Sequence, residues 1–250
     1  GASAHGEASS HGSDSDSESH GAGGGELEEP ISTVTISTRR GSLTAKSYNH
    51  GGGAPLNITS GPFLNRTEGG GNRAQVFSGW QYGSGYPGIS QPGVVGRDLP
   101  FYFWPVVWSN VTNSSSYLHN TSEYGTPNDT NRPGGPLFAA TFKSNGSAGN
   151  IFRLLADNAT VNALVQNIGV NCSSYNISST SAAFDPANNP QPEEVIAYYR
   201  ASSAALSLDG YNNTAVFSPV NAIAVPLLGD IDNPFTVCLN MTIQAAIPLV

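Results

Sequence analysis

The sequence predicts an α+β fold in which an antiparallel sheet and about three helices occupy residues 137–250. Strand-like and helix-like patterns alternate there in the order β-β-α-α-β-β-α, which is typical of an antiparallel sheet with helices on one face. The preceding segment, 31–136, is long, irregular and rich in Gly and aromatic residues. Residues 1–30 form a low-complexity arm, so we expect three regions along the chain.

The arm has no means of building a core. Residues 1–25 contain only Gly, Ala, Ser, His, Asp and Glu. We therefore expect an arm that is disordered when alone or exchanged with another copy. Its histidines are interpreted as solvated, because their spacing is irregular and no thiol accompanies them.

The first strand signal follows the arm. Residues 31–37 alternate in polarity and are rich in β-branched side chains, which favours a strand. No hairpin partner is recognised nearby, so we expect Ile31, Val34 and Ile36 to contact either the chain's own domain or an adjacent copy. The pair Arg39-Arg40 fits a dibasic processing site and fits an exposed basic pair equally well.

An aromatic hub, residues 101–108 (FYFWPVVW), is the densest apolar run in the chain. Pro105 in its middle excludes a continuous helix and a central strand. The segment before the hub matches G-x-G-x-x-G at 83–88, but no helix follows, so no dinucleotide site is expected. We expect this segment and the hub to pack closely against another surface. The candidate contact residues are Trp80, Phe101, Trp104 and Trp108.

The C-terminal region opens with a hairpin and a helix. Apolar runs at 137–143 and 150–157 flank Asn145-Gly146, which is a strong hairpin signal. Apolar residues from 161 to 168 then recur at helical spacing and predict the first helix. Residues 173–190 are expected to form a polar loop.

Four further elements complete the predicted region. Pro192 and the two glutamates after it are typical of a helix start, and this second helix is expected to run to about Tyr199. Short strands are expected at 204–208 and 214–217. A third helix is expected from Asp232 to about Ala245.

N-glycosylation signals indicate the compartment. Twelve asparagines lie in N-x-S/T context, whereas 23 Asn and 47 Ser plus Thr in 250 residues would give roughly four by chance. Because glycan acceptors mark surface loops of secreted proteins, we expect a secreted glycoprotein. Loop sequons should carry the sugars. The twelve are Asn57, Asn65, Asn110, Asn113, Asn120, Asn128, Asn145, Asn158, Asn171, Asn176, Asn212 and Asn240.

The cysteines agree with an oxidising compartment. Cys172 and Cys238 are the only two in the chain, and we predict that they form one disulfide. The bond would join the first predicted helix to the third. The loop-entropy relation gives such a long bridge a stabilising effect on the order of 4 kcal/mol.

Composition and motifs exclude several classes of function. The net charge is −8 and only 11% of residues are charged, so nucleic acid is not an expected partner. No apolar run is long enough to span a membrane. The chain starts without Met, which we interpret as a mature form whose signal peptide has been removed. We find no nucleophile elbow, metal-ligand motif or phosphate-binding loop, and so expect no cofactor, metal site or catalytic residue.

Several strings resemble a family of secreted proteins from mushroom-forming fungi, the basidiomycetes. The matching strings include the hub and extend over most of the chain from about residue 75 onwards. The resemblance implies a fungal, extracellular setting, and it carries no activity or site residue to this chain. The matching residues are 96–97, 101–108, 122–125, 132–135, 156–158, 199–203 and 208–211.

Two functional hypotheses follow from these features. The first is a structural glycoprotein of the cell surface or extracellular matrix that self-associates through the strand at 31–37 and the hub. The second is a carbohydrate-binding module or secreted hydrolase that stacks a sugar, such as cell-wall polysaccharide, on exposed tryptophans. Burial of Trp80, Trp104 and Trp108 between protein segments would favour the first; exposed and coplanar rings would favour the second.

Overall fold

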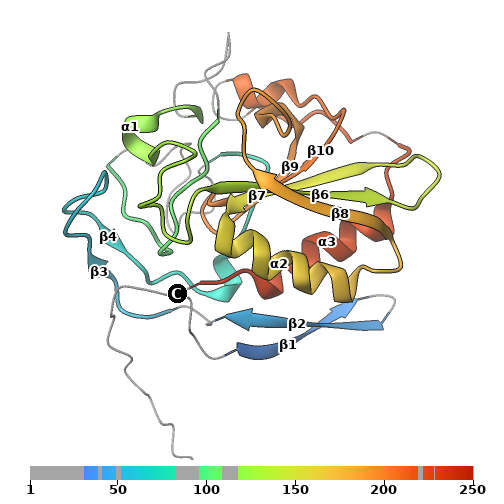
Figure 1. The fold of residues 1–250 in the computed structure, drawn as a ribbon, viewed down its shortest axis with the longest axis horizontal. Helices are drawn as coiled ribbons and strands as arrows, with labels where there is room; N and C mark the ends of the chain where they lie inside the picture. The colour runs from blue at the N-terminus through green and yellow to red at the C-terminus, as the bar shows by residue number, and fades with distance from the viewer. Residues whose placement is uncertain are drawn as a thin grey trace, which may run out of the picture.

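The fold has three layers: a six-stranded sheet, two helices below it, and a two-stranded hairpin below the helices (Figure 1). The computed structural model describes residues 31–249, apart from 39–40, 49–51, 83–95, 109–117, 219–221 and 228. The arm, Arg39-Arg40, the glycine match at 83–88, and the sequons Asn110 and Asn113 therefore lie outside the described residues.

The large sheet is antiparallel, as predicted, and its strand order is β5-β9-β10-β7-β6-β8. The predicted hairpin around Asn145-Gly146 is confirmed, since β6 and β7 pair in register from Leu137 opposite Asp157 to Lys143 opposite Ile151. The strands are β5 (Phe77–Gly79), β6 (Leu137–Ser144), β7 (Ile151–Asp157), β8 (Asn176–Ala183), β9 (Val195–Tyr199) and β10 (Ala204–Leu208).

Two helices cover one face of this sheet. Helix α2 (Asn158–Asn171) begins at the end of β7, and helix α3 (Asn233–Ala246) packs beside it. An aspartate caps each helix: Asp157 accepts from the Thr160 amide, and Asp232 from the Phe235 amide. These are the first and third helices of the prediction.

The second predicted helix is wrong. Pro192 and the two glutamates form only the 3₁₀ turn η3 (Pro192–Glu194), after which the chain continues as β9. The helix-start signals are genuine, but the following Val-Ile-Ala-Tyr-Tyr run is β-branched and aromatic and prefers a sheet. The described residues of this region therefore form two α-helices instead of three. A one-turn helix, α1 (Thr121–Tyr124), lies outside it.

Two further predictions in the C-terminal region are also wrong. The strand expected at 214–217 is the 3₁₀ turn η4 (Thr214–Phe217), which the Asn213 side chain caps by accepting from the Ala215 amide. The loop expected at 173–190 contains β8, which pairs with β6. Its Ser and Ala residues have weak strand propensity, so pairing with β6, and not local sequence, determines this strand.

The strand expected at 31–37 has a partner in its own chain. Strand β1 (Ile31–Thr38) pairs with β2 (Gly41–Tyr48), from Ile31 opposite Tyr48 to Thr38 opposite Gly41. The hairpin lies against α3 and α2. The expectation of an unpaired strand is therefore wrong, because the alternation of Leu43, Ala45 and their polar neighbours was not recognised as a second strand.

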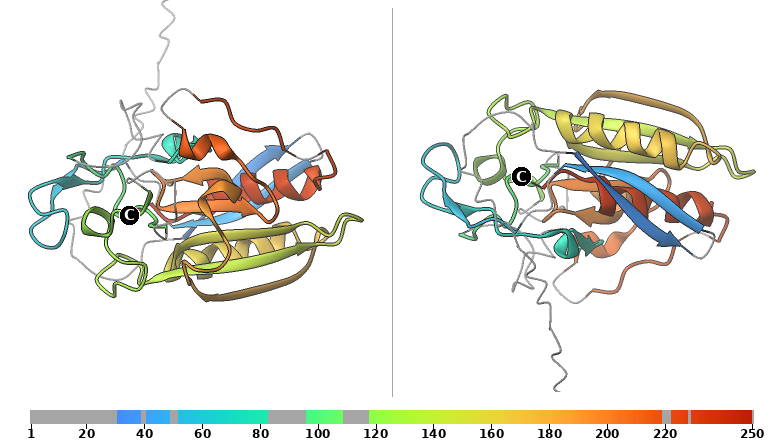
Figure 2. Two further views of the ribbon diagram at one scale, coloured as in Figure 1. Left: turned by 90° about the horizontal axis from the view of Figure 1, so that it is seen from above. Right: turned by 90° about the horizontal axis from the view of Figure 1, so that it is seen from below.

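Short elements complete the described chain. Strands β3 (Leu56–Asn57) and β4 (Thr67–Glu68) form a small ladder, and a 3₁₀ turn, η1 (Arg73–Gln75), precedes β5. Figure 2 shows β3 and β4 at one end of the molecule, away from α2 and α3. Within the described residues, no helix has the length and apolarity needed to cross a membrane.

Both faces of the large sheet are covered at its central strands. Neighbouring strand residues point to opposite faces, and Tyr198 and Tyr199 show what lies on each. The Tyr199 hydroxyl donates to Asn240 of α3 at 2.7 Å, whereas Tyr198 contacts the hub on the other side. The helices therefore cover one face and the hub covers the other, so all five residues of β10 between them are buried.

Candidate functional site

The aromatic hub is buried within its own chain. Phe101, Phe103 and Trp108 are at most 3% exposed. The Val106 amide donates to the Ser202 carbonyl at 2.8 Å, and the Trp108 indole donates to the Tyr198 hydroxyl at 3.1 Å. These contacts fix the hub across the turn between β9 and β10.

Tyrosines from distant segments close around the hub. The Tyr82 hydroxyl donates to the Val106 carbonyl at 2.5 Å. Its ring packs edge-on against Tyr198 and tilted against Tyr124, with centroids 5.4 and 5.6 Å apart. The sequence predicted a close-packed aromatic-glycine segment, and Tyr82 fits that prediction. Trp80 is only half-buried.

Arg132 holds the hub to the following loop. Arg132 is 2% exposed, and its guanidinium donates to four backbone carbonyls. Trp104 and Pro105 of the hub accept at 3.5 and 2.8 Å, and Tyr124 and Thr126 accept at 3.0 and 3.2 Å. Burial lowers the pKa of Arg132 to about 10, so the side chain stays charged at neutral pH. One buried cation thus supplies hydrogen bonds to four backbone carbonyls.

Arg200 is the centre of a second, deeper network. It is fully buried and forms an ion pair with Asp157 at 2.9 Å. It also donates to the Thr160 hydroxyl at 3.0 Å, the Ser203 hydroxyl at 2.6 Å and the Pro248 carbonyl at 2.8 Å. Burial lowers the pKa of Arg200 to about 10, and the Asp157 charge opposes that shift.

Phe103 of the hub packs against the face of the Arg200 guanidinium. The guanidinium carbon lies 3.5 Å from the centroid of the Phe103 ring, a close cation–π contact. Asp157 also accepts from the Thr160 amide and hydroxyl, so the same carboxylate caps α2 and pairs with Arg200. We call Arg132, Asp157, Thr160, Arg200 and Ser203 the arginine cluster.

The backbone at the arginine cluster has an unfavourable conformation that its contacts must hold in place. Arg200, Ala201 and Ser202 all adopt left-handed conformations, with φ of 52°, 50° and 63°. Each such non-glycine residue costs roughly 1–2 kcal/mol. The Ser203 amide donates to the Arg200 carbonyl, and the Arg200 amide to Val76 of the neighbouring segment. The buried contacts of Arg200 offset this strain and hold the turn.

Gly134 brings the loop after Arg132 onto the same network. Its φ is +80°, and a Cβ at this position would lie 1.8 Å from Asp157 Oδ2. The Ala159 amide of α2 donates to its carbonyl at 2.9 Å. Only glycine fits here, because both the conformation and the space exclude a side chain.

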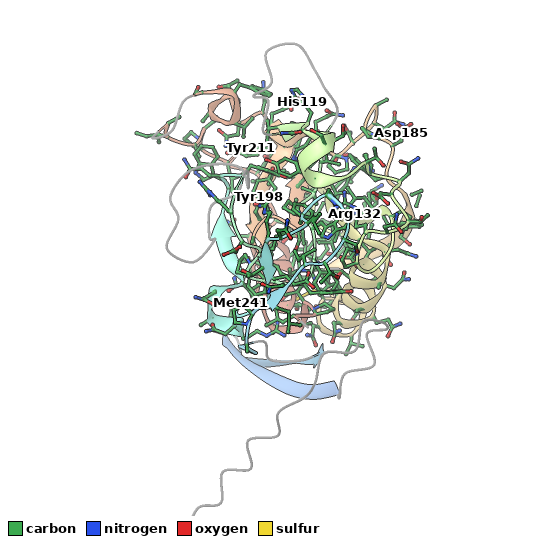
Figure 3. All side chains as sticks on the ribbon, turned by 90° about the vertical axis from the view of Figure 1, so that its left-hand side faces the viewer. His119, Arg132, Asp185, Tyr198, Tyr211 and Met241 are labelled. Atoms are coloured by element: carbon green, nitrogen blue, oxygen red, sulfur yellow. A yellow bond between two sulfur atoms is a disulfide. The ribbon has the colours of Figure 1, made fainter. Side chains whose placement is uncertain are left out.

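The arginine cluster and the hub have the chemistry of a structural centre. Their polar groups are buried and bonded mainly to one another and to the backbone. Figure 3 shows Arg132 and Tyr198 among packed side chains, with Asp185 and His119 nearer the periphery. In the part of the chain that the structure describes, no three His, Cys, Asp or Glu side chains are grouped so as to hold a metal ion.

Two of the three tryptophans pack against other aromatic or charged side chains. Trp108 is 2% exposed and packs edge-on against Phe184. The Trp104 ring contacts Phe63 edge-on at 5.3 Å and lies 5.6 Å from the Arg132 guanidinium. The two rings are thus packed against protein segments of the same chain.

The predicted disulfide is confirmed, with an S–S distance of 2.06 Å between Cys172 and Cys238. It joins the end of α2 to the middle of α3. The interaction residues Ile31, Val34 and Ile36 lie in the hairpin below these helices and are not brought to the hub. The structure thus places the predicted strand and the predicted hub in different parts of the chain's own fold.

Many of the sequons lie on the surface. Five of the described sequon asparagines are exposed, and Asn145 is at the tip of the β6–β7 hairpin. Asn240 is the exception that the sequence suggested, since it lies in α3 and accepts from Tyr199. Asn176 is the first residue of β8. The exposed five are Asn57, Asn65, Asn128, Asn145 and Asn212; Asn120, Asn158, Asn171 and Asn240 are partly exposed.

The two cluster arginines were not singled out from the sequence. A weak signal was present, because each arginine is followed by small residues: Gly134 and Gly135 come two and three positions after Arg132, and Ala201 to Ser203 follow Arg200 directly. The contacts of these arginines, such as Arg200 with Asp157 and Phe103, become visible only in the fold. Comparison with known protein families, with curated proteins and with solved structures finds no match to this chain.

Proposed function

We propose that this chain is a secreted, N-glycosylated structural protein of the cell surface or extracellular matrix of a mushroom-forming fungus, and that it self-associates. The sequon density is the observation that carries the proposal. Twelve sequons are present where chance gives roughly four, and five of them have exposed asparagines. A glycan coat of this density suits a protein whose role depends on its surface.

Burial of the hub supports a structural role over carbohydrate binding. A sugar-stacking site needs an accessible aromatic face, whereas Trp108 is covered and Trp104 lies against Arg132 and Phe63. The charged groups of the arginine cluster are likewise paired with one another or with the backbone of the same chain. We therefore assign the hub to internal packing, and we propose a structural protein in preference to an enzyme.

Enzymatic release of N-glycans from the native protein tests this proposal. We expect the mass to fall by several glycans, and peptide mapping should find them at exposed asparagines, including Asn145 and Asn212. Light scattering of the same preparation should give a mass above that of one chain. A native protein that carries no glycan would contradict the secretion argument, and a strict monomer would contradict self-association.

A further inference from the structure

Strand β8 is an open edge of the large sheet. It is the last strand in the order β5-β9-β10-β7-β6-β8 and pairs with β6 on its inner side. Figure 2 shows it at the rim of the molecule in both views, with no described segment beyond it. All five residues from Ser179 to Ala183 are exposed, so neither face of this part of the strand is covered.

The β8 edge lacks the features that usually prevent strand pairing. Protein sheets protect their edges with charged side chains, proline, bulges or very short strands. Residues 176–183 read NISSTSAA, with no charge and no proline. The register with β6 is regular from Ser178 to Ala183 and shifts only at the Asn176 end. The opposite edge, β5, is three residues long.

From this edge we infer that β8 is the surface at which a second copy of this chain adds, by antiparallel pairing of β8 with β8. This inference rests on the proposed self-association and names the surface that carries it. Of the earlier candidates, the hub does not serve, because it is buried within its own chain. A backbone-paired contact needs only an open edge, which β8 provides.

A second copy is the occupant that suits this edge, because the strand can pair with itself without opposing any charges. Around a twofold axis perpendicular to the sheet, one residue must lie opposite its own copy, since directly opposed residues share a face. With Thr180 on the axis, Ser179 lies opposite Ser181 and the pairing stays within the regular part of β8. Opposed Thr and Ser side chains are favourable pairs in antiparallel sheets. The strand brings no charges together, although the chain carries a net charge of −8.

The sequons are compatible with this register. With Thr180 on the axis, Asn176 lies opposite Phe184, beyond the end of the partner strand. No sequon occurs between Asn176 and Asn212, so residues 177–211 present no acceptor asparagine at the junction. A twofold contact closes on itself and gives a dimer. A filament or matrix would require a second contact elsewhere.

A lysine at the centre of the contact tests the inference. In Thr180→Lys, two like charges would oppose each other at the axis, while a single lysine is well tolerated at the edge of a monomer. The secreted, glycosylated protein should then dimerise at least about fivefold more weakly, since like charges at contact distance cost about 1 kcal/mol in water. Thr126→Lys is the matched control, because Thr126 is exposed and lies outside β8.

Light scattering over a concentration series gives the readout, and thermal unfolding checks that both variants are folded. If the native protein self-associates and Thr180→Lys does so equally well, the β8 contact is wrong while the proposed function stands. If the native protein stays monomeric at every concentration, both proposals fail.

Cross-linking provides an independent measurement. Opposed residues in an antiparallel pair have Cα atoms roughly 4.5–5.5 Å apart, which is within disulfide range. Thr180→Cys should therefore form a disulfide-linked dimer under mild oxidation, and Thr126→Cys should not. Equal cross-linking of the two variants would overturn the inference.

Discussion

Neutralising the Asp157 carboxylate should strongly destabilise the fold. The Arg200–Asp157 pair has side-chain exposures of 0% and 3%. Asp157→Asn keeps the size of the side chain and its ability to cap α2, so the change removes mainly the charge. Arg200 would then be a buried cation without a carboxylate partner. The expected loss in the free energy of unfolding is about 3–5 kcal/mol.

A second ion pair in the same protein provides the control. Arg153 and Asp209 form two hydrogen bonds of 2.8 Å, but their side chains are 23% and 20% exposed. Because solvent screens this pair, Asp209→Asn should cost no more than about 1 kcal/mol. The same chemical substitution therefore has two different expected effects, set by burial alone.

Urea unfolding followed by tryptophan fluorescence measures both variants, since the Trp104 ring lies 5.6 Å from the Arg132 guanidinium of the arginine cluster. A double-mutant cycle with Arg200→Met adds a further test. Once the cation is gone, Asp157→Asn should cost much less, with a coupling of about 2 kcal/mol or more. Equal losses for Asp157→Asn and Asp209→Asn, or additive effects in the cycle, would refute the reasoning.

Three other predictions concern the same scaffold. Gly134→Ala should lower the free energy of unfolding by about 2–4 kcal/mol, since its Cβ would overlap Asp157. Gly149 also has a positive φ but lies in open space, so Gly149→Ala should cost only about 1–2 kcal/mol. Equal urea midpoints for the two variants would contradict this prediction. Replacing both cysteines with alanine should lower the unfolding free energy on the order of 4 kcal/mol, and an unchanged midpoint would show that the bridge adds little. Burial raises the pKa of Glu194 above its ordinary value of 4.5; the folded state thus binds this proton more tightly, and stability should fall as pH rises through the folded pKa. Glu194→Gln should lessen that fall above pH 4.5, and an unchanged pH profile would argue against it.

Local signals predicted the elements that are specified locally. The Asn145-Gly146 turn placed the β6–β7 hairpin, and capping residues with helical spacing placed α2 and α3. Strand β8 was missed because Ser and Ala carry little strand preference, and its pairing with β6 is non-local. At Pro192 the start signals of a helix competed with the strand preference of the next residues, and the sheet prevailed.

The arginine cluster could not be derived from sequence for a related reason. Arg200 contacts Asp157, which is 43 positions away along the chain. No sequence-spacing rule connects the two residues. Several carboxylates in the chain could pair with each arginine, so the sequence does not show which one does. The left-handed backbone at 200–202 could not be predicted from the sequence either, because none of these residues is a glycine. The hub, by contrast, was identifiable from its aromatic density, although its burial within its own chain was not.

The most direct test of the proposed function is native mass spectrometry of the protein purified from its own source. One chain has a mass of 26.0 kDa. The proposal predicts a species heavier than two such chains, in which each chain carries several N-glycans. A single species at the bare mass of one chain would contradict both the glycan coat and self-association.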